Sequence, residues 1–324
     1  MLRRGGTVFL QQREASVFIV AVLLVLYFGF ISSAHTSFFT ENNIANVADA
    51  TAPYALIAVG EVFLLICGEI DLSVGFVWTL SPFLMFFFNA YYHFPLFLAI
   101  VAALICGALI GLINGLLVVV LRLPSFVATL GTSFVIYGFA LTTSAAQEKS
   151  LPAGAGAVGK WFGGYIWAEI LWCVAVVIIA QIILNRTRWG LHTIAVGGNL
   201  VGASEAGISV ARIKLGNFMA TGLFGALAGI LEAFRVGTID PSAGGYTPMF
   251  YAVAAAVIGG TALAGGSGTV IGAFVGMLVL AILQDGFNLL GISSNPYLII
   301  LGIAIVAAMV ANVYLTRLRR AGRS

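Results

Sequence analysis

Residues 67–75 read CGEIDLSVG and join two apolar runs, at 48–67 and 72–90, which they overlap at both ends. Each run has about the 20 residues that a helix needs to cross the hydrocarbon core of a bilayer. Glu69 and Asp71 interrupt the apolar pattern, and a glycine on each side of them allows the backbone to leave the helix. The stretch therefore predicts two membrane helices that are separated by a short break.

The composition extends this interpretation to the whole chain. Of its 324 residues, 61% are hydrophobic and 8% are charged, whereas soluble domains are about half apolar and about a quarter charged. The strict apolar–polar alternation of outer-membrane strands is missing. No spacing of cysteines or histidines suits a metal ion. The sequence predicts an all-α integral membrane protein that is surrounded by lipid bilayer, with no metal site and no nucleic-acid partner.

Ten apolar runs are long enough to cross a membrane. They lie near residues 17–34, 48–67, 72–90, 94–121, 124–145, 166–184, 214–235, 248–264, 270–290 and 295–314. With a cytoplasmic N-terminus, twelve of the 15 Lys and Arg residues fall on the cytoplasmic side, as the positive-inside rule requires. We therefore predict one transmembrane domain, 1–324, in which the segments 1–16, 185–213 and 315–324 are cytoplasmic.

Two features of this pattern leave alternatives open. The first span is either an uncleaved helix or a signal peptide cleaved after Ser32-Ser33-Ala34, and its long charged lead favours the uncleaved helix.

GxxxG pairs at 107–111 and 272–276 lie in the fourth and ninth spans, which suggests an inverted repeat of two five-helix halves. Close helix packing explains the same glycine pairs without a repeat.

The longest polar segment between spans, 185–213, contains the pattern of a short capped helix. Asn199 is a favoured N-cap and Gly207 a favoured residue after the last turn, so we expect about two helical turns between them. The segment has one charge, Glu205, and lacks the bulky anchors and basic face of a membrane-surface helix. We predict that this helix docks into a groove on another protein.

The signatures of catalysis are missing. Residues 154–160 spell GxxxxGK, but Trp161 stands where a phosphate-binding loop needs Ser or Thr. No HExxH or GxSxG sequence occurs. We interpret 154–160 as a flexible outer loop, and we predict that this chain is not an enzyme and binds no cofactor. Any ATP that drives it would bind to another polypeptide.

Three interpretations of CGEIDLSVG compete on physical grounds. The two acids form a proton or cation site, which is the usual hypothesis for carboxylates inside a membrane. Alternatively they bind a substrate, or Asp71 or Ser73 caps the helix that follows the break. Glu69 and Asp71 are two residues apart and do not share a helical face, which weakens a paired-carboxylate site.

Four blocks of the sequence resemble the permeases of bacterial ATP-binding-cassette (ABC) importers for ribose and related sugars. The blocks are GEIDLSVG at 68–75, LPSFVATLGT at 123–132, the coupling-loop pattern from Gly197 to Lys214, and a glycine-rich turn at 259–272. The signature residues of the first block are Gly68, Ile70, Asp71, Leu72, Ser73 and Gly75, and those assigned to the coupling loop are Gly198, Asn199, Ala203, Glu205, Ala206, Gly207 and Ile208. Glu69 is a departure, because that position is usually glycine or small in the family.

The resemblance implies a fold similar to the membrane subunit of the vitamin B12 importer, and a location in the bacterial cytoplasmic (inner) membrane. It implies a dimer with a second copy or a homologous permease. It also implies two cytoplasmic ATP-binding subunits, which carry ATP and Mg²⁺ and bind the coupling helix, and an extracytoplasmic substrate-binding protein. In this interpretation the chain moves a monosaccharide or polyol inward by alternating access.

The substrate pathway and the driving force are further predictions. Polar or aromatic residues of the central spans are candidates for the pathway: Asn114, Phe134 and Tyr137. The alternative function is a proton- or sodium-coupled secondary transporter that uses intramembrane carboxylates. Its candidate residues are Glu61, Glu69, Asp71, Glu232 and Asp285.

Overall fold

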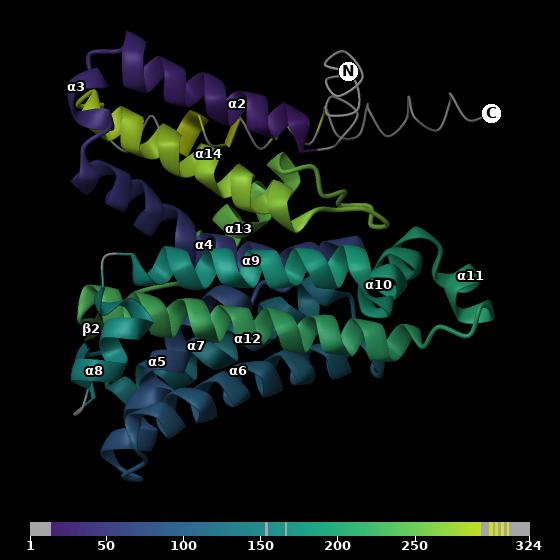
Figure 1. Ribbon diagram of the computed structural model, residues 1–324. Coiled ribbons are helices and arrows are strands. Elements are labelled where there is room, and N and C mark those ends of the chain that lie inside the picture. Colours follow the sequence, from purple (N-terminus) through teal and green to yellow (C-terminus); the bar gives the residue numbers. More distant parts are fainter. Residues whose placement is uncertain are drawn as a thin grey trace, which may run out of the picture.

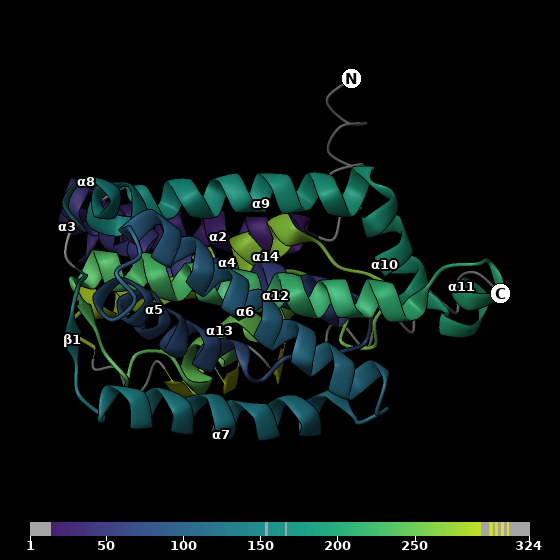
Figure 2. The same ribbon diagram turned by 90° about the horizontal axis from the view of Figure 1, so that it is seen from below.

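The computed structural model shows a bundle of long helices that run between two ends (Figure 1; Figure 2). The described residues are 14–152, 155–165, 167–292, 298–300, 302–303, 306–307 and 310. The predicted tenth span, 295–314, lies largely outside the described residues, and so do the predicted cytoplasmic termini, 1–16 and 315–324.

Each of the predicted spans before residue 295 contains a helix. The first part of the chain forms α2 (Ala15–Leu26), its π-helical continuation η1 (Tyr27–Ile31), α3 (His35–Phe38), α4 (Glu41–Ile66), α5 (Val74–Ala90), α6 (Leu96–Val119) and α7 (Ser125–Ser144). The second part forms α8 (Ala155–Gly159), η2 (Lys160–Gly164), α9 (Ala168–Arg186), α10 (Arg188–Gly198), α11 (Leu200–Glu205), α12 (Val210–Val236), α13 (Tyr246–Ile258) and α14 (Val270–Leu289).

The lengths of these helices suit a membrane. Within the described residues, six helices are long and apolar enough to cross a bilayer: α4, α6, α7, α9, α12 and α14. The apolar stretches α2–η1, α5 and α13 are shorter. The all-α membrane class that the composition predicts is therefore confirmed.

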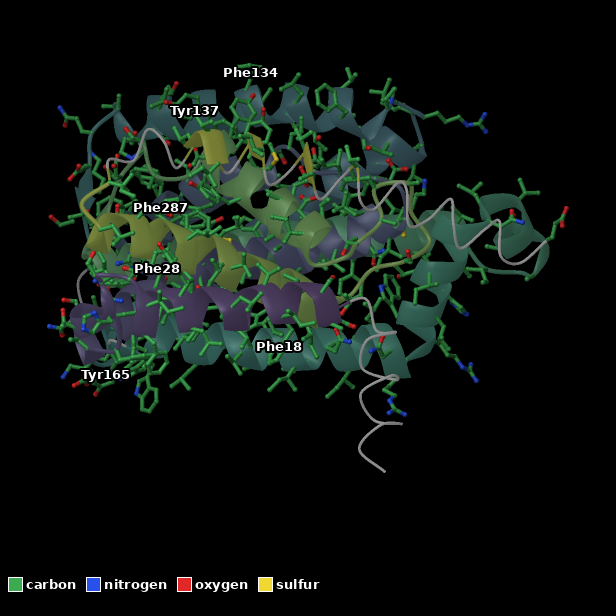
Figure 3. All side chains as sticks on the ribbon, turned by 90° about the horizontal axis from the view of Figure 1, so that it is seen from above. Phe18, Phe28, Phe134, Tyr137, Tyr165 and Phe287 are labelled. Atoms are coloured by element: carbon green, nitrogen blue, oxygen red, sulfur yellow. The ribbon has the colours of Figure 1, made fainter. Side chains whose placement is uncertain are left out.

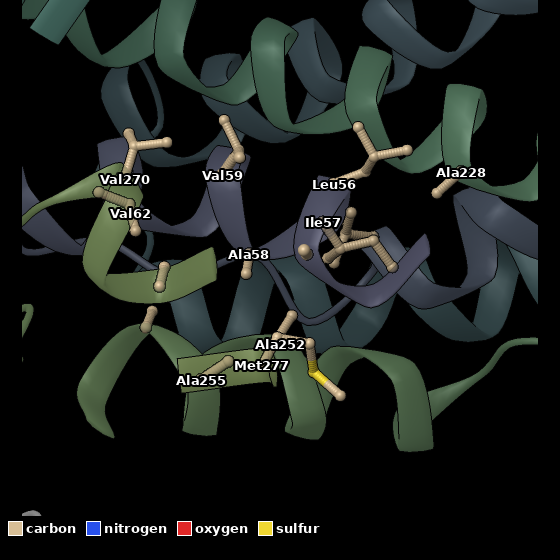
Figure 4. Close-up of a cluster of buried hydrophobic side chains, with 14 of the residues drawn as sticks. Leu56, Ile57, Ala58, Val59, Val62, Ala228, Ala252, Ala255, Val270 and Met277 are labelled. Carbon is tan, nitrogen blue, oxygen red and sulfur yellow. The ribbon is translucent and has the colours of Figure 1, made fainter. Parts of the chain in front are cut away.

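Helix α4 lies at the centre of the bundle and is buried from Ala55 to Ile66. Figure 4 shows its side chains between those of α12, represented by Ala228, and those of α13 and α14, represented by Ala252 and Met277. Lipid tails are as apolar as Leu side chains, so apolar character alone does not bury a membrane helix. Helix α4 is buried because α12, α13 and α14 pack around it. The break at the end of α4 is therefore placed inside protein rather than in lipid.

The GxxxG pairs make close helix contacts. A Cβ atom on Gly111 would lie 2.1 Å from Phe218 O of α12, and one on Gly276 would lie 2.2 Å from Ala255 O of α13. Such backbone approach is open only to glycine. Packing thus accounts for both pairs, which contact different neighbouring helices.

The two ends of the bundle carry different structures (Figure 1; Figure 2). At one end β1 (Lys149–Ser150) pairs antiparallel with β2 (Thr238–Ile239). Helices α10 and α11 lie at the opposite end, and α11 extends beyond the long helices.

The stretch predicted as a flexible loop near 154–160 is helical in α8, so that prediction is wrong about the local structure. The following turn is packed in place, because a Cβ on Gly163 would lie 2.4 Å from Leu231 O of α12.

Candidate functional site

The predicted helix break is present between α4 and α5. Residues 67–73 leave the helical hydrogen-bonding pattern inside the bundle, where free backbone N–H groups need partners. Ile70 N–H donates to Ser125 Oγ at 3.3 Å, and Leu72 N–H donates to Thr129 Oγ1 at 3.0 Å. Side chains of α7 therefore satisfy the backbone that the break exposes.

Asp71 holds the start of α5. Its side chain is fully buried, and its Oδ1 accepts hydrogen bonds from Ser73 N–H at 2.8 Å and from Ser73 Oγ at 2.7 Å. Asn114 of α6 donates to Asp71 Oδ2 at 3.2 Å and to Ser73 Oγ at 2.7 Å. Ser73 is the N-cap residue of α5, but its side chain bonds to Asp71 and makes no capping hydrogen bond to the helix. Asp71 therefore holds the N-cap residue in place without capping α5 itself. Asn114, a predicted pathway residue, is 0% exposed and holds the break instead of lining a surface.

Glu61 of α4 completes a buried polar cluster, which consists of Glu61, Asp71, Ser73 and Asn114. Glu61 Oε2 accepts a long hydrogen bond of 3.5 Å from Asp71 N–H. Glu61 Oε1 and Asn114 Oδ1 are buried without a hydrogen-bond partner among the described atoms. No three His, Cys, Asp or Glu residues gather as a metal site in the described part of the chain. The cluster therefore has spare acceptor atoms but not the ligand set of a metal centre.

The signature glycines have separate roles. Gly68 has a φ of +75°, a left-handed conformation that favours glycine at the end of α4. A Cβ on Gly75 would lie 1.9 Å from Gly245 O, and Gly245 N–H donates to Gly75 O at 2.9 Å. The first glycine ends a helix, and the second lets the loop before α13 lie directly on α5.

Glu69 forms an ion pair with Lys214 at the start of α12. The two side chains are 12% and 13% exposed. The residue that departs from the family pattern therefore has a partner within the coupling-loop block. This pair joins the break to α12, and it separates the roles of Glu69 and Asp71.

Three backbone segments meet at what we call the glycine joint, formed by Ile66, Gly197 and Gly266. Gly266 N–H donates to Ile66 O at 2.8 Å. A Cβ on Gly197 would lie 1.6 Å from Ile66 O and 2.7 Å from Gly266 N. The end of α4, the end of α10 and the glycine-rich turn before α14 are therefore in direct backbone contact.

All four blocks that carry the family resemblance converge here. The block at 68–75 forms the break, and the block at 123–132 supplies the hydroxyls of Ser125 and Thr129. The blocks at 197–214 and 259–272 supply the glycine joint and the partner of Glu69. Segments far apart in the chain thus build one site at the α10 end of the bundle.

Helix α10 was not predicted from the sequence. Thr187 caps it by accepting a hydrogen bond from Gly190 N–H at 3.4 Å. Its Trp189 Nε1 donates to Asn217 Oδ1 at 2.8 Å, and Asn217 Nδ2 donates in turn to Cys67 Sγ at 3.2 Å. The Thr187 cap was the local signal that could have revealed α10. Its anchoring to the break depends on Asn217, which no motif includes.

The predicted short helix of the loop is confirmed as α11. Asn199 Oδ1 accepts a hydrogen bond from Gly202 N–H at 2.9 Å. Gly207 has a φ of +81°, and Ile208 N–H donates to Ala203 O at 3.0 Å across the end of the helix. Both caps are those that the sequence predicts.

The two sides of α11 differ. Ala203 is 5% exposed and packs with Ile208 and other apolar residues of the loop, so its side chain faces the bundle. Leu200 and Val201 are 48% and 63% exposed. Exposed residues next to them in and around α11 are Gly198, Asn199, Ser204, Glu205, Ala206, Gly207 and Ser209. An apolar surface with one acid therefore extends outward at this end of the bundle.

An aromatic cluster lies at the edge of the bundle that contains α7. It consists of Phe76, Phe134, Tyr137, Tyr246 and Phe250, whose rings are 4.8–6.4 Å apart from centroid to centroid. Figure 3 shows Phe134 and Tyr137 at this edge. Phe134 is 62% exposed, and the Tyr246 hydroxyl is 3.0 Å from Ser133 Oγ. Two predicted pathway residues thus lie together, and Tyr246 at the centre of the cluster was missed.

The carboxylates of the ion-coupled alternative are dispersed. Glu232 accepts a 2.6 Å hydrogen bond from Arg235 three residues later. Asp285 Oδ2 accepts a 2.8 Å hydrogen bond from Asn43 Nδ2 of α4. Glu69 pairs with a lysine, and the other two lie in the buried polar cluster. The five acids therefore do not form one shared site.

The fold and this site are those of an all-α membrane protein with a polar break inside its bundle. A family model described as the permease component of a branched-chain amino acid transport system matches residues 43–309, so the chain belongs to this family. The chain is 36% identical to the xylose/arabinose import permease protein XylH of Sulfolobus acidocaldarius, over 94% of this chain and 86% of that protein. It is 33% identical to the ribose import permease protein RbsC of Escherichia coli, over 90% of this chain and 92% of that protein.

A third relative, the ribose import permease protein RbsC of Bacillus subtilis, is 36% identical over 86% of this chain and 87% of its own length. No solved structure gave a significant match. With its family and its apolar helices, the chain is a multi-pass membrane protein.

Proposed function

We propose that this chain is the permease subunit of an ABC importer, which moves a monosaccharide or polyol inward by alternating access. The observation that carries the proposal is the glycine joint, through which α10 contacts the end of α4 at the helix break, and the exposed helix α11 follows α10 directly in the chain. A displacement of α11 by a partner would reach the membrane helices through backbone contacts. The relatives are import permeases named for xylose, arabinose and ribose, which supports a sugar as substrate.

The partners follow from the proposed mechanism. Two cytoplasmic ATP-binding subunits bind the exposed surface of α11, which includes Val201 and Glu205, and they hold ATP and Mg²⁺. This chain binds no cofactor and is not an enzyme. A second copy, or a homologous permease, completes the pathway, and an extracytoplasmic binding protein delivers the sugar. The apolar residues on α11 favour protein docking, since contacts between proteins concentrate their binding energy in a few buried side chains.

The proposed topology extends the observed bundle. Ten spans cross the bacterial inner membrane as a single domain, 1–324, in a fold similar to that of the vitamin B12 importer's membrane subunit, with two five-helix halves. The loop 185–213 and both termini are cytoplasmic. The opposite placement of α11 and the β1–β2 pair supports a two-sided arrangement of this kind.

The aromatic cluster is the proposed contact surface for the substrate. The apolar faces of sugar rings pack on aromatic rings, and a hydroxyl such as that of Tyr246 adds a hydrogen bond. Phe134 and Tyr137 contribute to this surface. Asn114 acts indirectly, because it holds Asp71 and the break.

The proposal is tested with the reconstituted complex in vesicles. Val201→Asp places a charge on the exposed face of α11, and we expect it to reduce both ATP hydrolysis stimulated by the binding protein and sugar uptake. Val236→Asp is the matched control, because Val236 is also exposed but lies at the end of α12 next to β2. If Val201→Asp assembles and transports normally, α11 is not the docking helix.

Two other outcomes would replace the proposed function. Uptake by this chain alone, driven by an ion gradient, would establish the secondary transporter. Uptake of branched-chain amino acids in place of sugars would assign the substrate that the family description names. Both outcomes are measured in the same vesicles with radiolabelled substrates.

A further inference from the structure

A cavity of about 550 Å³ opens between α9 and α12. Figure 2 places α9 on the side of the bundle opposite α7, so this cleft lies away from the aromatic cluster. Its walls include Val176, Ile179 and Ile183 on α9 and Ala220 and Phe224 on α12. We call this feature the α9–α12 cleft.

The polar groups that line the cleft already have hydrogen-bond partners within the protein. Trp189 Nε1 donates to Asn217 Oδ1 at 2.8 Å, and Thr187 Oγ1 donates to Ile183 O at 2.7 Å. A sugar would lose its hydrogen bonds with water on entering such a site, because little is available to replace them. The α9–α12 cleft therefore suits an apolar ligand and is unsuited to the proposed substrate.

Two arginines lie near the α10 end of the helices that form the cleft, at the end of α9 and at the start of α12. Arg186 follows Ile183 by three residues on α9, and Arg212 precedes Gly216 by four residues on α12. Residues three or four apart lie on the same helix face, so the spacing places each arginine one turn beyond a residue that lines the cleft. Both arginines are exposed, and neither forms an ion pair with a residue that the structure describes.

We propose that the α9–α12 cleft binds an acyl chain of an anionic phospholipid, with its headgroup phosphate between Arg186 and Arg212. Basic pockets between membrane helices on the cytoplasmic side are known to recognise anionic headgroups. A slender chain fits better than a partner helix, since a helix about 10 Å wide would fill this volume with only about five residues. The lipid site does not depend on which substrate the permease carries.

Lipid binding to the purified full-length chain tests the proposal. Native mass spectrometry would measure the retention of phosphatidylglycerol and of phosphatidylcholine with identical acyl chains. We expect a preference for phosphatidylglycerol, and we expect the double variant Arg186→Gln/Arg212→Gln to lower its affinity about 25-fold, roughly fivefold for each arginine. Arg122→Gln is the matched control, because Arg122 is an exposed arginine between α6 and α7.

A second pair of variants tests the acyl chain. Ala220→Trp fills the cleft and should reduce the retention of both lipids, whereas Ile178→Trp adds the same ring at an exposed position of α9 that does not line the cleft. Ala220→Leu is the smaller replacement if thermal unfolding shows that the tryptophan variant is misfolded. Reduced retention with either folded variant supports the assignment.

Three results would overturn the proposal. The first is equal retention of both lipids by the unchanged protein, and the second is an unchanged affinity for phosphatidylglycerol in the double glutamine variant. The third is binding of inorganic phosphate as tightly as the lipid, with no effect of filling the cleft, which would assign a simple phosphate site. All readouts are binding measurements, so a failure here leaves the proposed transport function intact.

Discussion

Gly197→Ala is the sharpest test of the glycine joint, because it adds one methyl group where three backbones meet. The new Cβ would lie 1.6 Å from Ile66 O and 2.7 Å from Gly266 N. Real Cβ contacts stay beyond about 3.0 Å, so α10 and α4 must separate by roughly 1.4 Å in a close-packed interior. The obstructing atoms belong to the backbone, and no side-chain rotation relieves the overlap.

The magnitude follows from two effects. Overpacking of a tight interior costs about 1–3 kcal/mol, and separating Gly266 N–H from Ile66 O leaves buried groups unpaired at about 1–3 kcal/mol. The expected loss of stability at the joint is therefore about 2–6 kcal/mol. Gly198→Ala is the matched control, because a Cβ on that neighbouring glycine meets nothing within 4 Å.

Cys67 reports the opening of the joint directly. It is 5% exposed and lies beside Asn217, next to the joint in the chain. The measurement uses a Cys106→Ser background, which removes the more exposed thiol. We expect maleimide to label Cys67 in membranes at least about thirtyfold faster when Gly197→Ala is added to this background than without it. A factor of about thirty corresponds to about 2 kcal/mol. Equal labelling rates in Gly197→Ala and Gly198→Ala would refute the reasoning.

Three further predictions concern the same site. Asp71→Ala leaves three donors without their acceptor and should cost about 3 kcal/mol in thermal unfolding, while Asp71→Asn keeps an acceptor oxygen and should lose less than half of that; an equal loss would require the negative charge itself. Lys214→Met should cost about 2 kcal/mol by leaving Glu69 unpaired, and Glu69→Gln/Lys214→Met should recover most of it; additive losses in the double-mutant cycle would contradict the pairing. Tyr246→Ala should lower sugar uptake severalfold without affecting assembly, with Tyr246→Phe intermediate, because the ring supplies the proposed contact area and the hydroxyl, which lies 3.0 Å from Ser133 Oγ, the proposed hydrogen bond to the sugar; uptake unchanged in both would remove the aromatic cluster from the pathway.

The long apolar helices and the caps of α11 were predictable because their signals are local. An apolar run of about 20 residues has few stable alternatives to a membrane helix, and Asn199 and Gly207 mark the ends of α11 by their own chemistry. The start of α4 was less visible. This helix begins at Glu41, seven residues before the apolar run, and its polar first turns are stabilised by distant partners such as Asp285, which bonds to Asn43.

The sequence by itself determined the membrane class, the positions of the apolar helices, the break at 67–73 and the capped loop helix. Only the tertiary structure decided which of these parts meet. Glu69 pairs with a lysine 145 positions away, Asn114 turns inward to Asp71, and the glycines at 197 and 266 close on the end of α4. Caps and hydrophobic runs depend on neighbouring residues, whereas these contacts depend on how the helices cross, and no local pattern encodes a crossing.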